Sequence, residues 1–512
     1  MRRRLAAGLL AAGALALPAA AADAPADDPR PDAAFAAVHA VASGHGVDGA
    51  SAFAAQLAAF RADAQHACRH PLYARYFRAR LGTPAPAPCD APVPFLLTGD
   101  DASDDAATDG TRLLQLDPRR VAAVHLLFGG AGDGWASRFG HVALRLVVCP
   151  HVGATPRRCD ENLQEHVVLG FVASVDSVDI DPLRGMFGGY KAQLVASPFM
   201  SVYRDYAINE FREVYSLPLR LAADRLPQVL RELGEVHWQF ADDYRFLTNN
   251  CATMLQSALR VIAPEVLAPL DGAFARPDRL FESLRASVAA DGRVLEDLAQ
   301  AERDGFYFSS TRPFFERAAE ELLLAMAEPW FLGFADYAQR DAGGRRAAWQ
   351  ADAALQSRLA RERHLHDAQL MLEEWQAMQA GRRLLSQAAR YFEEAELPAR
   401  LAAPPAPLAP DVAALLARCV VDPIERLRQP APRHAGIPPA PQALPLRGKT
   451  LPDECARDLD GPQVLAALAQ LHPQGQARWD EVVHAARELH ASVDNVLWLK
   501  DLRALALQAP QR

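Results

Sequence analysis

The chain has 512 residues, of which 50% are hydrophobic and 23% charged, and its formal net charge is −9 at pH 7. This composition is typical of a globular protein with more than one hydrophobic core, and it argues against fibrous, wholly disordered and polytopic membrane proteins. The negative balance offers no basic surface to phosphate backbones, so we expect no nucleic-acid partner.

The N-terminus has the pattern of a cleaved secretory signal peptide. Residues 2–4 are arginines, residues 5–17 form an apolar segment, and residues 20–22 are alanines that match an A-x-A cleavage signal. The apolar segment is short for a bilayer span. We therefore expect residues 1–22 to be removed and the mature protein to act in the periplasm, attached to the membrane at most peripherally.

The rest of the chain divides into helical and strand-rich stretches. Helical spacing covers residues 33–81, and loop or exposed acidic chain is expected at 83–92 and 94–110. Apolar patterning then predicts strands at 121–128, 141–148, 167–175 and 213–219. Helices are expected at 224–240, at 250–262, at 315–397 with breaks near Pro329 and Gly343, and at 464–507. Frequent prolines between 398 and 452 argue against regular elements there.

These elements predict an α+β fold with flanking helical regions. The expected segments are a signal peptide (1–22), a mainly helical N-terminal region (23–110), a domain with an antiparallel sheet and a cysteine-bearing helix (111–280), a helical region (281–397), a proline-rich linker (398–452) and a C-terminal helical segment (453–512).

The seven cysteines are Cys68, Cys89, Cys149, Cys159, Cys251, Cys419 and Cys455. Disulfides persist in an oxidising compartment. Pairing between sequence neighbours is the simplest arrangement, and it joins Cys68 to Cys89, Cys149 to Cys159 and Cys419 to Cys455. This arrangement leaves Cys251 as a free thiol, which calls for a chemical explanation.

His141 begins a predicted strand on a face that suits a functional side chain. The pleat places the aliphatic residues of this strand on one face, which we assign to the core: Val142, Leu144, Leu146 and Val148. His141 starts the opposite face, directly after Gly140, where it can be presented at a cleft. A lone strand histidine is more often structural, so a functional role requires a partner.

Cys251 supplies that partner. Asn249 or Asn250 is positioned to cap the following helix, which puts Cys251 in its first turn. A helix N-terminus favours a thiolate and offers N–H donors to an oxyanion. A lone cysteine is more often a small buried hydrophobe. The free thiol, the helix start and the earlier histidine together indicate a nucleophile and its base.

Four stretches of sequence resemble a known family. They are SRFGHVALRL (137–146), MFGGYKAQL (186–194), YRDYAINEFREVYSLPL (203–219) and DYRFLTNNCATML (243–255). Their combination and order are similar to those of the Lnb N-terminal periplasmic domain family. The flanking helical regions are not covered by this resemblance.

The resemblance implies a circularly permuted, NlpC-type papain-like domain with His141 as catalytic base and Cys251 as nucleophile. It also implies the chemistry of lipoprotein N-acylation, in which the cysteine takes an acyl chain as a thioester and passes it to an amine. One departure is Gly170, which occupies a position where the family is expected to carry a polar residue. The residue that orients His141 is therefore left open.

Further candidates follow from the predicted strands. If 141–148 and 167–175 pair as a hairpin closed near the turn between Cys149 and Cys159, Ser174 or Asp176 would orient His141. Asn250 and Tyr244 are candidates for an orienting group or an oxyanion donor.

Three residues are candidates for the substrate cleft. Arg145 would meet an anionic substrate group or hold a carboxylate such as Glu210. Gly189 and Tyr190, together with Gly188, are expected to form a tight turn over the cleft, with Tyr190 as a wall.

We therefore expect an exported cysteine-dependent acyltransferase or hydrolase that forms an acyl-thioester from a lipid or lipoprotein acyl ester at the membrane surface. Two alternatives stay open, an NlpC-type peptidoglycan amidase or endopeptidase and a non-catalytic periplasmic binding module. Metalloprotease and nucleotide-binding motifs are not found, so we expect no metal and no cofactor. A lipid-contacting patch is expected within 315–337, with Phe331 and Phe334 exposed.

Overall fold

The computed structural model describes residues 30–45, 48–63, 65–83, 89–98, 111–132, 138–174, 189–270, 272–404, 407–422, 433–438 and 461–508. The expected signal peptide at 1–22 lies outside these residues, as do Asp176, Gly188 and Cys455.

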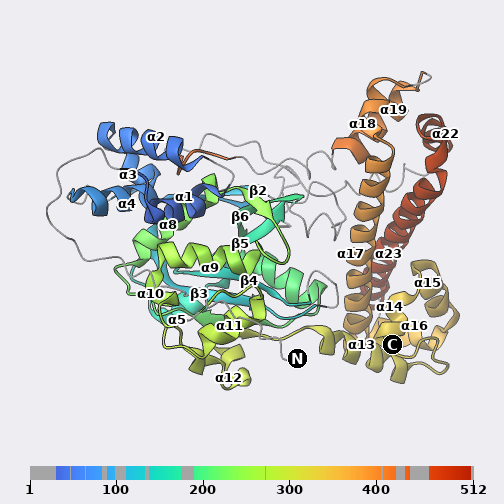
Figure 1. The fold of residues 1–512 in the computed structure, drawn as a ribbon. Coiled ribbons are helices and arrows are strands. Elements are labelled where there is room, and N and C mark those ends of the chain that lie inside the picture. Colours follow the sequence, from blue (N-terminus) through green and yellow to red (C-terminus); the bar gives the residue numbers. More distant parts are fainter. Residues whose placement is uncertain are drawn as a thin grey trace, which may run out of the picture.

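Among the described residues, a nine-stranded sheet forms the centre of the α/β part of the molecule (Figure 1). Its strands are β1 (Val93–Thr98), β2 (Thr111–Leu116), β3 (Val121–Gly129), β4 (His141–Val148), β5 (Val167–Ser174), β6 (Tyr190–Pro198), β7 (Val214–Pro218), β8 (Asp242–Tyr244) and β9 (Tyr307–Phe308). Their order is β2-β1-β6-β5-β4-β3-β7-β9, and β8 pairs with β6. The pair β1–β6 is parallel and the other described pairs are antiparallel, so the expected antiparallel sheet is corrected to a mixed one.

The strands predicted from the sequence are β3, β4, β5 and β7, and the α+β class is confirmed. The sequence patterns do not predict β1, β2 or β6. β1 contains Pro94, and β6 contains Lys191 and Gln193, residues that are uncommon in strands. Each of these two strands lies between two neighbours, whose hydrogen bonds supply the stabilisation that local propensity lacks.

Helices α8 (Leu226–Gln239) and α9 (Cys251–Ile262) pack on one face of the sheet, as predicted from their amphipathic spacing. The aliphatic residues of β4 lie in this same core: Val142, Leu144, Leu146 and Val148. The opposite face is covered too, because Ala143 belongs to a second cluster with Phe199 and Val214. Both faces of β4 are therefore packed, and only His141 at the start of the strand is half-buried.

The described helices before β1 are α1 (Ala33–Ser43), α2 (Gly49–Ala62), α3 (His66–Arg69) and α4 (Pro71–Leu81). Their aromatic residues share the core of the sheet, and Phe35 meets Phe53 edge-on with ring centroids 4.8 Å apart. Arg75 of α4 forms an ion pair of 2.7 Å with the buried Glu232 of α8. The N-terminal helices and the sheet are thus one packed unit.

A helical region follows the α/β part. Its elements and those leading to it are α10 (Pro264–Leu267), α11 (Pro277–Arg285), α12 (Leu298–Arg303), α13 (Arg312–Ala325), α14 (Phe334–Gln339), α15 (Ala342–Ala351), α16 (Ala353–Arg361), α17 (Arg363–Glu394), α18 (Leu397–Ala402), α19 (Pro410–Leu416), α22 (Pro462–Leu471) and α23 (Gln476–Gln508). In Figure 1, α17 and α23 lie side by side as a long antiparallel pair, with α13 to α16 at one end and α18, α19 and α22 at the other. The break expected near Gly343 lies between the end of α14 at Gln339 and the start of α15 at Ala342. Gly343 itself is in the first turn of α15, which Asp341 caps.

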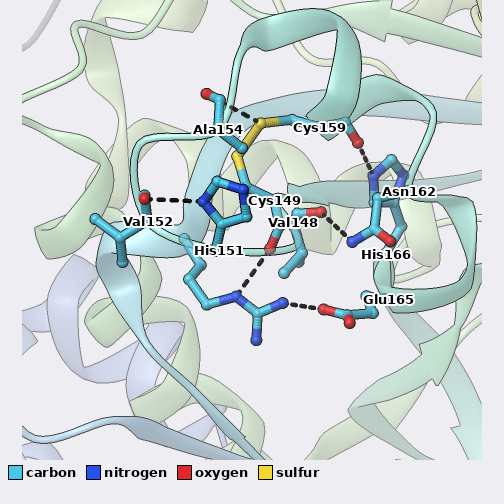
Figure 2. The surroundings of a disulfide bond; sticks show 10 residues. Val148, Cys149, His151, Val152, Ala154, Cys159, Asn162, Glu165 and His166 are labelled. Carbon is cyan, nitrogen blue, oxygen red and sulfur yellow. Dashed lines mark hydrogen bonds and ion pairs between the residues drawn. A yellow bond between two sulfur atoms is a disulfide. The ribbon is translucent and has the colours of Figure 1, made fainter.

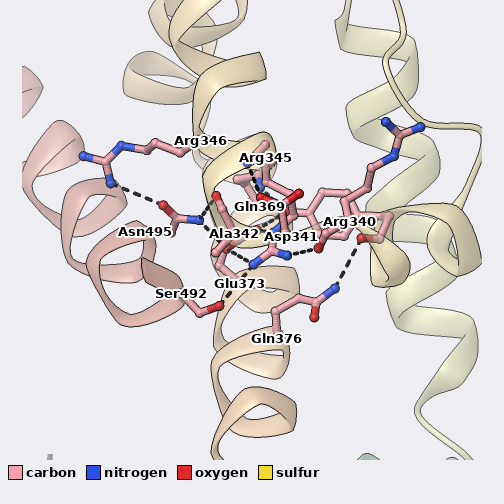
Figure 3. Close-up of polar contacts among 12 residues, drawn as sticks. Arg340, Asp341, Ala342, Arg345, Arg346, Gln369, Glu373, Gln376, Ser492 and Asn495 are labelled. Atoms are coloured by element: carbon pink, nitrogen blue, oxygen red, sulfur yellow. Dashed lines mark hydrogen bonds and ion pairs between the residues drawn. The ribbon is translucent and has the colours of Figure 1, made fainter. Parts of the chain in front are cut away.

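A buried ion pair joins the helices at one end of this region (Figure 3). Arg345 and Glu373 are both fully buried, and Nε of Arg345 lies 2.8 Å from Oε1 of Glu373. Tyr337 and Asn495 donate hydrogen bonds to the same carboxylate. These groups come from α14, α15, α17 and α23, so a single carboxylate ties four helices together and its burial is compensated by hydrogen bonds.

The two aromatic residues expected in a lipid-contacting patch are buried in the helical region. Phe331 and Phe334 are 1% and 7% exposed and belong to its hydrophobic core. The exposed apolar side chains of the same stretch include Leu324 and Leu332. None of the helices in the described ranges is both long and apolar enough to cross a membrane.

The expected disulfides Cys68–Cys89 and Cys149–Cys159 are both present. The second joins the short helix α5 (Pro156–Asp160) to the end of β4, where Asn162 donates to the carbonyl of Val148 (Figure 2). Cys419 is also disulfide-bonded, and its expected partner lies outside the described residues. Cys251 is a free cysteine, as predicted, and its side chain is buried.

Candidate active site

Cys251 is the first residue of α9, and the residue before it determines this position. The side-chain oxygen of Asn250 accepts hydrogen bonds from the N–H groups of Ala252 at 2.9 Å and Thr253 at 3.2 Å. The Thr253 hydroxyl in turn accepts from the N–H of Asn250 at 2.8 Å, which completes a capping box. Of the two asparagines considered, Asn250 is therefore the cap.

His141 is held at the beginning of β4 by a sharp turn. Gly140 has φ of 76°, and a methyl group there would lie 2.5 Å from the carbonyl oxygen of Gly129. A side chain at this position would clash, so the turn depends on glycine. His141 then pairs with Gly129 at the end of β3.

The structure brings Cys251 and His141 together, and the thiol is hydrogen-bonded to the imidazole. The N–H groups of Val142 and Ala252 also bond to the sulfur. Burial alone raises the pKa of Cys251, but the imidazolium charge and these hydrogen bonds outweigh burial and lower the pKa below its ordinary value. Burial likewise lowers the pKa of His141, but the thiolate charge outweighs it and raises that pKa. Each of the two residues therefore stabilises the charged form of the other.

Tyr244 is a further group at the sulfur. Its hydroxyl is hydrogen-bonded to Cys251, and its ring packs against the core. Burial and the nearby thiolate raise the pKa of Tyr244, so the hydroxyl stays protonated and remains a donor. A fixed donor beside a nucleophile is suited to hold an oxyanion.

Three residues near His141 are not predicted from the sequence to lie beside it. Tyr206 stands edge-on to the imidazole, with ring centroids 6.3 Å apart. The guanidinium of Arg212 lies over the Tyr206 ring, 5.1 Å from its centroid, and Nε of Arg212 lies 2.8 Å from Oε2 of Glu210. All three belong to the family-like run 203–219, and this run is the signal that could have identified them.

On the neighbouring strand β5, a glycine faces His141. A methyl group at Gly170 would lie 3.4 Å from Nε2 of His141. The β4–β5 register pairs Leu144 with Leu169, which differs from the expected one. Ser174 is the last residue of β5 and pairs with Lys191 of β6, on the side of β5 away from β4. The other expected orienting residue, Asp176, lies outside the described residues.

These elements place a histidine strand, the run 203–219 and a cysteine helix around one point, in the order that the family resemblance requires. Residues 108–276 match the Lnb N-terminal periplasmic domain family. The match confirms the resemblance, and the periplasmic setting of the family agrees with the expected export. No curated protein and no solved structure matches the chain. The relation to NlpC-type and papain-like enzymes stays a prediction.

Of the two roles expected for Arg145, the structural one fits its surroundings, although its partners differ from the expected carboxylate. It is fully buried, and its guanidinium donates to Nδ1 of His166 at 2.8 Å, to the Ser216 hydroxyl at 3.0 Å and to the carbonyl of Gly305 at 2.8 Å. Burial lowers the pKa of Arg145 to about 10. The carboxylate considered as its partner, Glu210, pairs instead with Arg212.

Of the residues expected to form a turn over the cleft, Gly188 lies outside the described residues and Tyr190 lies in a strand. Tyr190 is the first residue of β6 and is buried, whereas Gly189 is exposed directly before it. Tyr190 pairs with Tyr244 of β8. Tyr190 thus supports the strand that carries Tyr244, because the two residues are direct neighbours in the sheet.

Proposed function

We propose that this protein is a periplasmic cysteine acyltransferase or hydrolase, with Cys251 as nucleophile and His141 as general base and acid. The observation that carries the proposal is the hydrogen bond between a free, buried thiol at the first turn of α9 and an imidazole at the start of β4. A thiolate is a far stronger nucleophile than a thiol, and an adjacent imidazolium favours it.

The chemistry follows from the groups around the sulfur. The Cys251 thiolate attacks the carbonyl carbon of an ester, so that a C–S bond forms and the Tyr244 hydroxyl donates to the resulting oxyanion. The C–O bond then breaks, and the His141 imidazolium gives its proton to the departing alcohol. An amine or a water molecule attacks the thioester next and transfers a proton to His141, which releases the acyl product and regenerates the thiolate–imidazolium pair.

The proposed substrate is the acyl ester of a lipid or lipoprotein at the membrane surface. Apolar side chains flank both reacting residues in the sequence. Leu247, four residues before Cys251, is 60% exposed, and Phe139, two residues before His141, is half-buried. Apolar side chains that are exposed or half-buried this close in sequence to the reacting residues favour an acyl chain over a polar peptide.

Intact-mass measurement of the mature protein tests the proposal. After incubation with phospholipid vesicles, we expect an acyl adduct that neutral hydroxylamine removes, that is absent from Cys251→Ser and that forms much more slowly in His141→Ala. His151→Ala is the matched control, because His151 is an exposed histidine on the turn after β4. An adduct formed with muropeptides alone would identify a peptidoglycan enzyme. Absence of any adduct would favour the binding module.

A further inference from the structure

The segment from 204 to 213 links the candidate active site to the helical region. It follows α7 (Phe199–Tyr203), continues as the π-helix Arg204–Asn209 and enters β7 at Val214. Tyr206, Glu210 and Arg212 lie on the side of His141, as described above. The residue between the latter two, Phe211, packs into the helical region.

Phe211 has an unusual backbone conformation that its surroundings maintain. Its φ is 53°, in the left-handed region that residues with a Cβ rarely adopt. Its ring stacks on Trp375 of α17, with centroids 5.6 Å apart, and meets Phe315 of α13 at 5.3 Å and Phe334 of α14 at 5.6 Å. The packed rings of three helices therefore hold the backbone between Glu210 and Arg212 in place.

Polar contacts attach the same segment at further points. Thr311 donates from its N–H and its hydroxyl to the carbonyl of Ala207, at 3.0 and 2.7 Å. The Ser310 hydroxyl donates to the carbonyl of Phe211 at 2.8 Å. Arg382 of α17 forms an ion pair of 3.0 Å with Asp205. The segment is thus attached to residues 310–382 at its beginning, middle and end.

On the other side, the segment presses against the imidazole. A methyl group at Gly129 would lie 2.8 Å from the ring of Tyr206, so the absent side chain leaves the space in which this ring meets His141. The strand on the opposite side, β5, presents Gly170 to the imidazole, so this position supplies no side chain that could orient it.

We propose that Tyr206, Glu210 and Arg212, here called the positioning cluster, hold His141 in place of an orienting side chain from β5, and that the helical region seats this cluster through Phe211. The inference rests on the proposed function, because it names what positions the base of that reaction. It assigns a role to α13, α14 and α17, which lie outside the Lnb domain.

The charges of Glu210 and Arg212 affect the ionisation of His141 and, through it, that of Cys251, and this effect can be measured. The positive charge of Arg212 disfavours the imidazolium form of His141, and the negative charge of Glu210 favours it. The Glu210–Arg212 ion pair keeps these effects in balance. Removing the carboxylate leaves Arg212 uncompensated beside His141, so the imidazolium and its partner thiolate become less stable.

The test is a pH titration of thiolate ultraviolet absorbance in the full mature chain, taken as the difference from Cys251→Ser. We expect a midpoint below that of an ordinary thiol in the unsubstituted protein, and midpoints higher by about one pH unit in Phe211→Ala and Glu210→Gln. Glu210→Asp keeps a carboxylate, so its midpoint should lie between those of Glu210→Gln and the unsubstituted protein. The matched controls are Phe331→Ala, a buried ring of the same core without a ring contact to Phe211, and Glu320→Gln, an exposed carboxylate of α13. Both controls should keep the original midpoint.

The outcomes separate the two proposals. A midpoint near ~8.5 in the unsubstituted protein, the value of an ordinary thiol, would overturn the proposed function and the positioning role with it. A low midpoint that neither Glu210→Gln nor Phe211→Ala moves would overturn the positioning cluster alone. A shift in Glu210→Gln without one in Phe211→Ala would overturn the link to the helical region. If Phe211→Ala does not fold, Phe211→Leu, which keeps an apolar anchor, replaces it and should show a smaller shift.

Discussion

The reactivity of Cys251 depends on opposing effects on one sulfur atom. Burial favours the neutral thiol, whereas the imidazolium of His141 and the N–H groups of Val142 and Ala252 favour the thiolate. The second effect is larger, so the pKa of Cys251 falls while that of His141 rises. The thiolate of Cys251 and the imidazolium of His141 therefore stabilise each other, which favours the charged form of the proposed nucleophile.

Removing the imidazole should reverse the pKa shift of Cys251. In His141→Ala burial remains without the compensating charge, so the pKa of the thiol should rise above its ordinary value of ~8.5. Labelling by iodoacetamide near neutral pH should slow by about tenfold or more and recover at alkaline pH. Peptide mapping of the non-reduced protein should place the label at Cys251. A label found there only after denaturation, or a disulfide at Cys251, would exclude it as the nucleophile.

Gly129 should be needed for activity because the absence of a side chain there leaves room for the Tyr206 ring. Gly129→Ala places a methyl group 2.8 Å from the Tyr206 ring, which must then move relative to His141. We expect acyl transfer to fall by about tenfold, with an overpacking cost of about 1–3 kcal/mol in the free energy of unfolding. The control is Gly381→Ala in α17, where a methyl group meets Leu489 at an ordinary 3.8 Å and activity should persist. Full activity in Gly129→Ala would show that the position of Tyr206 does not matter.

At the scale of elements, the start of α9 is attached to its surroundings by one amide side chain. The oxygen of Asn250 caps the helix, and its Nδ2 donates to the carbonyls of Phe246 and Ala275 at 2.8 Å each. The same residue thus begins the helix and holds two loops against it. The place of Cys251 follows from this arrangement, because the helix cannot begin earlier or later without losing the cap.

Loss of this cap should weaken both stability and reactivity. Asn250→Ala removes the cap and leaves buried carbonyls without their donor, so the free energy of unfolding should fall by about 2–3 kcal/mol, measured by urea denaturation. The pKa of Cys251 should rise because the first turn of α9 loosens. Asn249→Ala is the control, since Asn249 bonds to Asp242 and Asp243 but does not cap the helix. An equal loss in both variants would contradict the capping argument.

At the scale of the whole molecule, the helical region is assembled around a charge rather than around apolar contacts alone. Arg345 and Glu373 are buried together, and four helices contribute to their hydrogen-bond network. Such a network specifies one arrangement of the helices, because any other arrangement would leave a charge without a partner. This arrangement also positions the rings that hold Phe211.

Breaking the pair on one side should therefore be costly. Arg345→Met leaves Glu373 buried without its partner, and we expect a loss of about 3–5 kcal/mol in the free energy of unfolding, followed by circular dichroism in denaturant. The double variant Arg345→Met with Glu373→Met should recover most of this loss, because no isolated charge remains. A double variant as unstable as the single one would show that the helices depend on the shapes of these side chains and not on their charges.

Several features of the site could be predicted from the sequence because their causes are local. The cap at Asn250, which lies next to Cys251, acts within three residues, and the alternation after His141 acts within one strand. The disulfide Cys149–Cys159 spans ten residues, so its pairing needs little more than a turn. From such local signals the sequence predicts the α+β class and the free thiol, and it names both residues that the proposed reaction uses.

Tertiary structure alone decided what surrounds the dyad and how the parts are joined. Gly170 faces His141 because of the β4–β5 register, and Arg145 is buried because residues far along the chain cover its face of the sheet. Tyr206 meets His141, and Phe211 enters the helical region, because segments distant in sequence pack on both sides of one short stretch. Periodicity shows that a side chain will be buried or exposed on an element, but not which distant group it will contact. Those contacts depend on strand register and on long-range packing, which no local pattern encodes.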